Sequence, residues 1–99
     1  MIRHIVSWNY REDLSKEENY NNAKKVKEDL EALKDKIEGI KFIEVIIEPI
    51  KSCTADIILI SEFETMKELD YYQVHDEHVK IGKFIRANLT NRQCIDYEF

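Results

Sequence analysis

The sequence predicts a small α+β domain whose elements follow the order β-α-β-β-α-β. Three observations lead to this fold class: the succession of alternating and helical hydrophobic patterns, the length of 99 residues, and the presence of only two glycines and one proline. A chain of this length has room for one modest core but not for two. Because Gly and Pro are scarce, most residues are expected to lie in helices and strands. Residues 1–99 are therefore predicted to form a single domain.

The first strand and the first helix have the clearest patterns. Residues 2–8 alternate, so that one face of the predicted strand carries Ile2, His4, Val6 and Trp8. Ser15 with Glu18 three residues later is a capping-box pattern, which marks a helix start. Apolar residues then recur in steps of three and four along one helical stripe, at Tyr20, Ala23, Val26, Leu30, Leu33 and Ile37. Gly39 suits the left-handed residue that ends such a helix.

Two further strands are predicted at residues 40–48 and 55–63. Pro49 ends the first of them, since proline cannot donate to a strand ladder, and residues 50–54 form the connection. The second strand is apolar on both sides over residues 57–60, which is typical of a central strand.

The second half of the chain is predicted to contain a broken helix and a last strand. Thr65 and Glu68 repeat the capping-box pattern before a short amphipathic segment. A second helical segment covers about residues 75–88. Its apolar stripe consists of Val74, His78, Ile81 and Ile85. Gly82 lies inside this helix, where a missing side chain lets another group approach closely. Residues 92–99 alternate again and form the final strand.

The simplest fold for this order is the ferredoxin-like split β-α-β arrangement, a four-stranded antiparallel sheet with both helices on one face. The strands at residues 40–48 and 55–63 carry apolar residues on both faces, so the uncovered face of the sheet needs a cover as well. The chain has no residues left to provide it. We therefore expect a homodimer in which two sheets pack face to face about a two-fold axis.

Charge and cysteine content argue against several classes of protein. The 15 Lys and Arg stand against 20 Asp and Glu, a formal net charge of −5, so no basic surface is left to neutralise nucleic-acid phosphates. No apolar run approaches the ~18 residues of a membrane span, and the first residues lack the apolar segment of a signal peptide. Cys53 and Cys94 suit a reducing compartment. These features favour a soluble cytoplasmic protein without nucleic-acid or membrane partners.

One segment concentrates the side chains suited to chemistry. Residues 71–78 contain two of the three histidines and two of the five tyrosines. His4 lies on the strand face that should meet the helices, so it is expected across a cleft from this segment. Imidazole and phenol groups are suited to proton transfer near neutral pH. The candidate catalytic residues are therefore His78, Tyr72 and His4, and the expected ligand contacts are His75, Trp8 and Ile81.

Each of these residues also has a structural interpretation, which the sequence leaves open. His78 falls in an apolar stripe, where a hydrogen-bonded core histidine would lie. His75 suits a helix N-cap followed by Asp76, an acid that the helix dipole favours. Tyr72 suits a packing residue whose hydroxyl reaches the surface.

Neither a metal ion nor a cofactor is expected. His75 and His78 are three residues apart, whereas the helix of zinc proteases needs histidines four apart, and no cysteine pair supports a zinc site. Two glycines cannot build a phosphate-binding loop or a dinucleotide fingerprint.

Five motifs resemble one known family along essentially the whole chain. They are the start MIRHIV, the segment EALKDKIEGI at residues 31–40, the strand end SEF at 61–63, the run YQVHDEH at 72–78 and the closing DYE at 96–98. Together they resemble the stress-responsive A/B barrel (Dabb) domain, and the resemblance implies a dimeric α+β barrel. Asp76 stands where the family usually has proline, and Ile46 or Ile47 where it often has glycine, which would narrow a pocket there.

The resemblance implies little about activity, because most members have no assigned reaction. One plant member is a polyketide cyclase that works by aldol condensation without a cofactor. By resemblance, His78 would be the general base, Tyr72 would donate a hydrogen bond to the oxyanion, and His4 would orient the substrate. We expect first a small dimeric protein that binds an organic ligand between sheet and helices. The alternatives are a cofactor-independent cyclase or lyase and a monooxygenase-like member of the wider barrel superfamily, which haem binding would favour.

Overall fold

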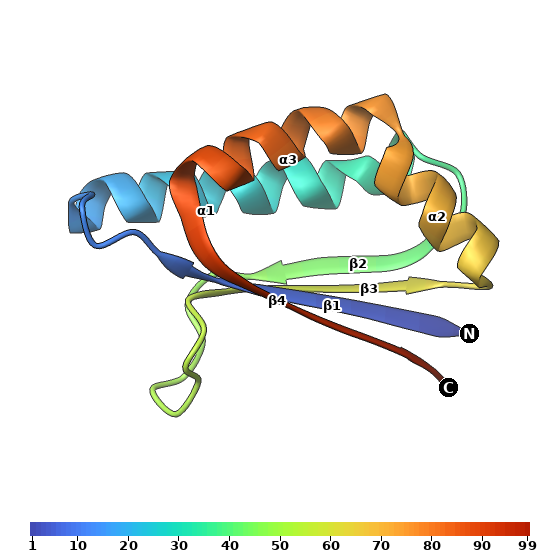
Figure 1. The fold of residues 1–99 in the computed structure, drawn as a ribbon, viewed down its shortest axis with the longest axis horizontal. Coiled ribbons are helices and arrows are strands. Elements are labelled where there is room, and N and C mark those ends of the chain that lie inside the picture. The colour runs from blue at the N-terminus through green and yellow to red at the C-terminus, as the bar shows by residue number, and fades with distance from the viewer.

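A four-stranded antiparallel sheet forms one layer of the molecule and the helices form the other (Figure 1). The structure, a computed structural model, describes residues 1–99. In chain order the elements are β1 (Ile2–Tyr10), α1 (Lys16–Glu31), the 3-10 helix η1 (Ala32–Asp35), β2 (Ile40–Ile46), β3 (Ile57–Phe63), α2 (Met66–Val74), α3 (Asp76–Asn88) and β4 (Leu89–Glu98). The strand order is β2-β3-β1-β4 and every neighbouring pair is antiparallel. The predicted ferredoxin-like fold is confirmed.

All four strands differ from the prediction at one boundary or both. β1 continues to Tyr10 and not only to residue 8, β2 ends at Ile46 and not at residue 48, and β4 ends at Glu98. The third strand begins at Ile57 and not at residue 55, while the last begins at Leu89, three residues earlier than expected. Leu89 is buried and lies opposite Tyr10, so pairing with an extended β1 continues up to the end of α3. A register shift between Ser7 and Asn9 accommodates this longer pairing.

Helix α1 begins as predicted but differs from the prediction at Tyr20 and at its C-terminal end. Ser15 Oγ accepts the Glu18 N–H at 3.1 Å, and the Glu18 carboxylate accepts the Ser15 N–H at 3.2 Å. Tyr20 was expected on the buried stripe but is 40% exposed, and Asn19 is buried in its place because its amide donates to the Arg11 carbonyl at 3.0 Å. The α-helix ends at Glu31 and continues as η1, where the prediction had one helix to residue 37.

The core lies between the helical layer and the sheet. Its largest fully buried side chains are Tyr72, Phe63, Leu30, Leu33 and Ile37. Val74 was expected on the buried stripe of the second helical segment but is 72% exposed. It belongs to the last turn of α2, and the extended backbone of His75 separates α2 from α3, so Val74 does not share the face of α3. No helix has the length and hydropathy that crossing a membrane requires.

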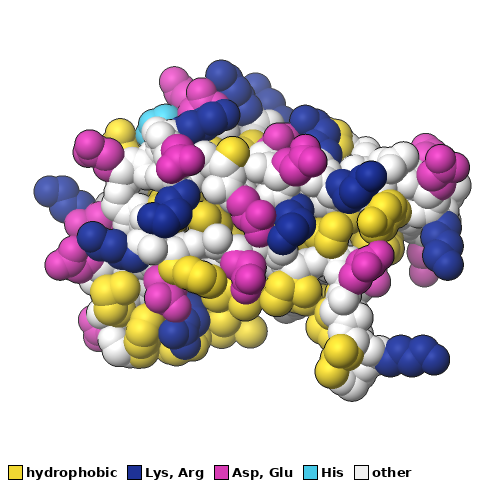
Figure 2. All heavy atoms as spheres, turned by 180° about the vertical axis from the view of Figure 1, so that it is seen from behind, with side chains coloured by type: hydrophobic (Ala, Val, Ile, Leu, Met, Phe, Trp, Pro, Cys, Tyr) yellow, Lys and Arg dark blue, Asp and Glu magenta, His cyan; other side chains and the backbone are white.

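The opposite face of the sheet is uncovered and apolar. Its exposed large side chains include Phe42, Ile95, Tyr97 and Phe99, of which Ile95 is 57% exposed. Figure 2 shows hydrophobic side chains gathered along the lower edge of the molecule, on the side of the sheet away from the helices. The loop between β2 and β3 projects from this side as well (Figure 1).

Gly39 is the position in the fold where a side chain would be most strained. Its φ is +98°, and a Cβ there would lie 2.9 Å from Cγ of Glu68. Glu68 closes the capping box of α2, since its carboxylate accepts the Thr65 N–H at 3.1 Å.

We expect Gly39→Ala to lower the free energy of unfolding by about 1–2 kcal/mol from the left-handed backbone alone, measured by urea denaturation. Glu38→Ala, at the exposed neighbouring residue, should change it little; equal losses in the two variants would contradict this account.

Candidate functional site

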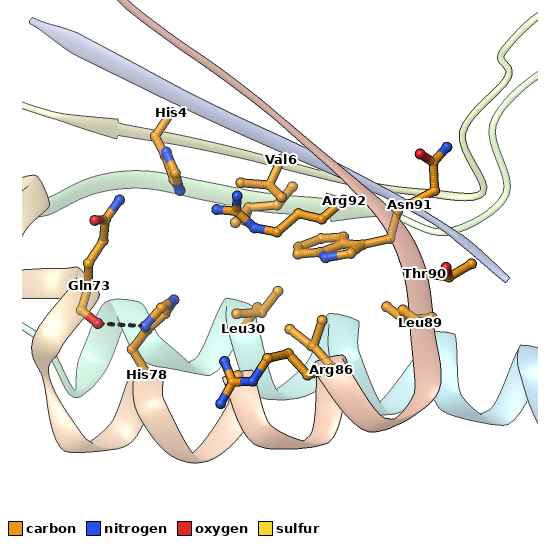
Figure 3. Close-up of a pocket in the computed structure, with 14 residues that line it drawn as sticks. His4, Val6, Leu30, Gln73, His78, Arg86, Leu89, Thr90, Asn91 and Arg92 are labelled. Atoms are coloured by element: carbon orange, nitrogen blue, oxygen red, sulfur yellow. Dashed lines mark hydrogen bonds between the residues drawn. The ribbon is translucent and has the colours of Figure 1, made fainter. Parts of the chain in front are cut away.

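A cavity of about 490 Å³ opens between α3 and the sheet, beside β1 and β4. Figure 3 shows its walls: β1 supplies His4, α3 supplies His78 and Arg86, and β4 supplies Arg92. Trp8 also lines it, together with aliphatic side chains from both layers. The structure therefore brings three of the predicted site residues, His4, Trp8 and His78, to one cavity.

His78 presents a basic nitrogen to this cavity. Its Nδ1 lies 3.0 Å from the Gln73 carbonyl oxygen. A carbonyl oxygen only accepts, so Nδ1 carries the proton and the neutral ring keeps a free lone pair on Nε2. Burial lowers the pKa of His78 below 6.5, and the charges of His4, Arg92 and Arg86 lower it further, although the Gln73 bond opposes them. The imidazole is thus kept neutral near pH 7.

His4 is oriented by a carboxylate. It is buried on β1, and its Nδ1 lies 2.5 Å from Oδ1 of Asp96, its partner across the β1–β4 ladder. Because an ionised carboxylate only accepts, the His4 Nδ1–H donates and its Nε2 is free. Such a carboxylate fixes the tautomer and the orientation of an imidazole.

Tyr72 lies against both histidine rings but does not line the cavity. Its ring centroid is 4.5 Å from that of His78 and 6.2 Å from that of His4. Its hydroxyl is buried and has no hydrogen-bond partner. Burial raises the pKa of Tyr72, so the phenol stays protonated. An unpartnered buried hydroxyl is costly and uncommon, and it leaves a donor available beside the histidines.

The other two expected ligand contacts lie outside the cavity wall. His75 is the N-cap of α3: its Nδ1 accepts the Glu77 N–H at 3.1 Å, and its ring lies edge-on against Tyr71. The structural interpretation therefore accounts for this residue. Ile81 packs against the hydrophobic core.

Sequence reasoning missed Arg86, Arg92 and Asp96. Arg86 had a usable signal, because His78, Gly82 and Arg86 are four residues apart and therefore share one face of α3. Arg92 and Asp96 reach the site only through the pairing of β4 with β1, which no local pattern indicates.

One group of side chains has the atoms of a metal site. The ligand atoms of His4, Cys94 and Asp96 all lie within 4.8 Å of one another. The hydrogen bond between His4 and Asp96 already accounts for the closeness of those two residues. Burial raises the pKa of the Cys94 thiol, which disfavours the thiolate that a metal would need.

The family follows from a match over nearly the whole chain. The model of the Stress responsive A/B Barrel Domain matches residues 2–99, and the protein belongs to this family. The predicted resemblance is confirmed. No curated protein matches the chain significantly.

Solved structures share the fold. A dimeric protein of unknown function and ferredoxin-like fold from Bacteroides fragilis is 38% identical, with a TM-score of 0.92 over 99% of this chain and 95% of that one. A hydroxynitrile lyase from Passiflora edulis is 14% identical, with a TM-score of 0.79 over 97% and 90% of the two chains. An antibiotic biosynthesis monooxygenase is 10% identical, with a TM-score of 0.78 over 100% and 98%. The last two show a common fold alone.

The protonation of His78 gives a first test of the site. Because its pKa is lowered in the folded state, the unfolded chain binds more protons as the pH falls below 6.5. The free energy of unfolding should therefore decline as the pH falls through this window, and His78→Gln should remove part of the decline. NMR titration should place the pKa of His78 below 6.5, and Arg86→Gln or Arg92→Gln should raise it. A wild-type pKa at or above 6.5 would contradict this description.

Proposed function

We propose that this chain forms a homodimer that binds a small organic carbonyl compound in the cavity between α3 and the sheet. One observation carries the proposal. His78 and His4 both use Nδ1 in hydrogen bonds, to the Gln73 carbonyl and to Asp96, so neither ring uses its Nε2 and both rings line the same cavity. Two imidazole rings beside a buried phenol are suited to a ligand that gains or loses a proton when it is bound. The proposed compartment is the cytoplasm, as expected from the sequence.

The homodimer is proposed through the uncovered face of the sheet. The similar protein from Bacteroides fragilis is dimeric. Ile5 and Ile95 are opposite each other on β1 and β4, and both point away from the helical layer, where Phe42 and Tyr97 add exposed apolar surface. An apolar sheet face of this kind is typical of a protein–protein interface.

The proposed dimer can be tested with two variants, each of which introduces one negative charge: one on the uncovered face of the sheet and one on the helical layer. Wild-type protein should sediment as a dimer at micromolar concentration, and Ile95→Glu should sediment as a folded monomer, because a carboxylate would be buried against apolar side chains. Val74→Glu makes a comparable change on the exposed end of α2 and should leave the dimer intact. A monomeric wild-type protein, or dissociation of both variants, would overturn the proposed interface.

A second candidate function is a cofactor-independent cyclase or lyase, favoured by the contact of Tyr72 with both histidines. In the proposed reaction His78 Nε2 removes a proton from the carbon next to a carbonyl group. The electron pair moves to the carbonyl oxygen, and the Tyr72 hydroxyl, which does not line the cavity, would have to turn toward that oxygen to donate a hydrogen bond. The enolate carbon then bonds to a second carbonyl carbon, and the imidazolium returns its proton to the new alkoxide. His4, held by Asp96, positions the substrate. The monooxygenase-like alternative is supported by fold similarity only.

A panel of small ketones and aldehydes tests binding and chemistry together. A ligand at about ten times its Kd adds about 1.4 kcal/mol to the free energy of unfolding, a shift of several degrees in Tm. This shift should be lost in His78→Ala. If the chain is also an enzyme, NMR in D₂O should show deuterium uptake next to the carbonyl, slowed about a hundredfold or more in His78→Gln.

Tyr72→Phe separates chemistry from stability. It removes a buried hydroxyl without a partner, so it should not lower Tm, yet it should slow deuterium uptake. Tyr71→Phe, which removes an exposed hydroxyl from the next residue, should leave both unchanged. Ligands that stabilise wild type and His78→Ala equally would show that the proposed site is not used.

A further inference from the structure

We infer that the ligand of this cavity is an organic acid, whose carboxylate is bound by Arg86 and Arg92 while its carbonyl end lies against His78 and His4. The inference rests on the proposed function, because it names the class of compound that the same cavity would bind. Three observations support it: the positive charge of the cavity wall, the lack of acidic partners for two of the four arginines, and the close contact between Gly82 and Arg86.

The charge of the cavity wall is opposite to that of the whole chain. The chain carries a formal net charge of −5. The 14 residues that line the cavity nevertheless include two arginines and two histidines and no acidic residue. Asp96, which lies opposite His4 on β4, is engaged with the His4 ring. A cationic wall in an acidic protein favours an anionic ligand.

The four arginines of the chain fall into two pairs. Arg3 forms a salt bridge with Glu62 at 3.0 Å, and Arg11 forms one with Asp13 at 2.7 Å. Arg86 and Arg92 form no salt bridge with any acidic side chain, and both line the cavity from opposite sides (Figure 3). A planar guanidinium donates two parallel hydrogen bonds to a carboxylate, so the two unpaired groups have the chemistry to bind one.

Gly82 makes room for one of these groups. It lies one turn before Arg86 and one turn after His78 on the same face of α3, and it lines the cavity. A Cβ at this position would lie 3.2 Å from Nη1 of Arg86. The missing side chain thus lets the guanidinium lie along the helix, within the cavity wall. Glycine disfavours a helix interior, and this contact gives it a role here.

The position along α3 favours a carboxylate over a phosphate. Phosphate groups are typically bound at the N-terminus of a helix, where free N–H groups and the helix dipole attract them. The first turn of α3 instead carries Asp76 and Glu77. The cavity runs along the side of α3 from His78 to Arg86, next to the C-terminal end, where the dipole opposes a doubly charged ligand more than a singly charged one.

Three compounds that share one acetyl-aryl group test the inference: 4-acetylbenzoate, its neutral methyl ester, and 4-acetylphenyl phosphate. Binding is followed by NMR shifts of the Trp8 indole and the His78 ring, both in the cavity wall. Wild-type protein should bind the carboxylate at least about tenfold more tightly than the ester. The double variant Arg86→Gln, Arg92→Gln should lose this difference and keep its affinity for the ester. Lys83→Gln, which removes one positive charge from the exposed side of α3, should keep the difference.

Gly82→Ala gives a second test in which the protein stays folded. Alanine favours the helix, so Tm should not fall. The new methyl group should displace Arg86 and weaken binding of the carboxylate more than binding of the ester. Equal weakening of the two ligands would contradict the role of Arg86.

The remaining outcomes separate the inference from the proposed function. If wild-type protein binds the ester and the carboxylate equally in this cavity, the organic acid is wrong while the ligand-binding function stands. Tighter binding of the phosphate would replace carboxylate by phosphate and overturn the inference. If none of the three compounds shifts the Trp8 and His78 signals at millimolar concentration, the inference and the proposed function are both overturned.

Discussion

The antiparallel ladder between β1 and β4 is the interaction on which both the sheet and the site depend. It places His4 opposite Asp96, although these residues lie at the two ends of the chain. The backbone hydrogen bonds of the ladder hold the two side chains on one face of the sheet. The contact between them therefore costs little additional conformational entropy. The same ladder brings Arg92 to the cavity. The candidate site therefore forms only when the last strand has joined the sheet.

The cavity exists because the helical layer is narrower than the sheet. β4 is exposed along its whole length except for Leu89, while the inward residues of β1 and β3 are buried. The side of β4 that faces the helices is therefore covered by α3 only near its start. Polar side chains occupy this uncovered strip, since apolar ones would face water there. The centre of the sheet therefore forms the hydrophobic core, and the β4 edge leaves the cavity open to a ligand.

The fold could be predicted because each element is specified by nearby residues. The capping boxes at Ser15 and Thr65 lie where the sequence indicates them, and the alternation of β1 correctly places His4 and Trp8 inward. The predicted burial of Tyr20 was wrong, because Asn19 donates a hydrogen bond to a backbone carbonyl and is buried in its place. Hydrophobic periodicity does not register such a hydrogen bond.

The site could be predicted only in part, for a related reason. His78 and Tyr72 are close in sequence, and a histidine beside a tyrosine is visible without a structure. The Asp96 partner of His4 and the absence of an acidic partner for Arg92 depend on strand register and on the pairing of every other charge. For His75 the prediction erred in the other direction: the sequence offered it as a ligand contact, whereas its side chain caps helix α3.

The alternation of β1 has a consequence for how the chain tolerates insertions and deletions. Inward residues such as His4 line the cavity, and outward residues such as Ile5 form the apolar face. One residue added to or removed from this strand would exchange the two sets at once, turning the imidazole outward and an aliphatic side chain into the cavity. Length changes are therefore expected in connections such as the loop of residues 47–56, which projects from the sheet (Figure 1).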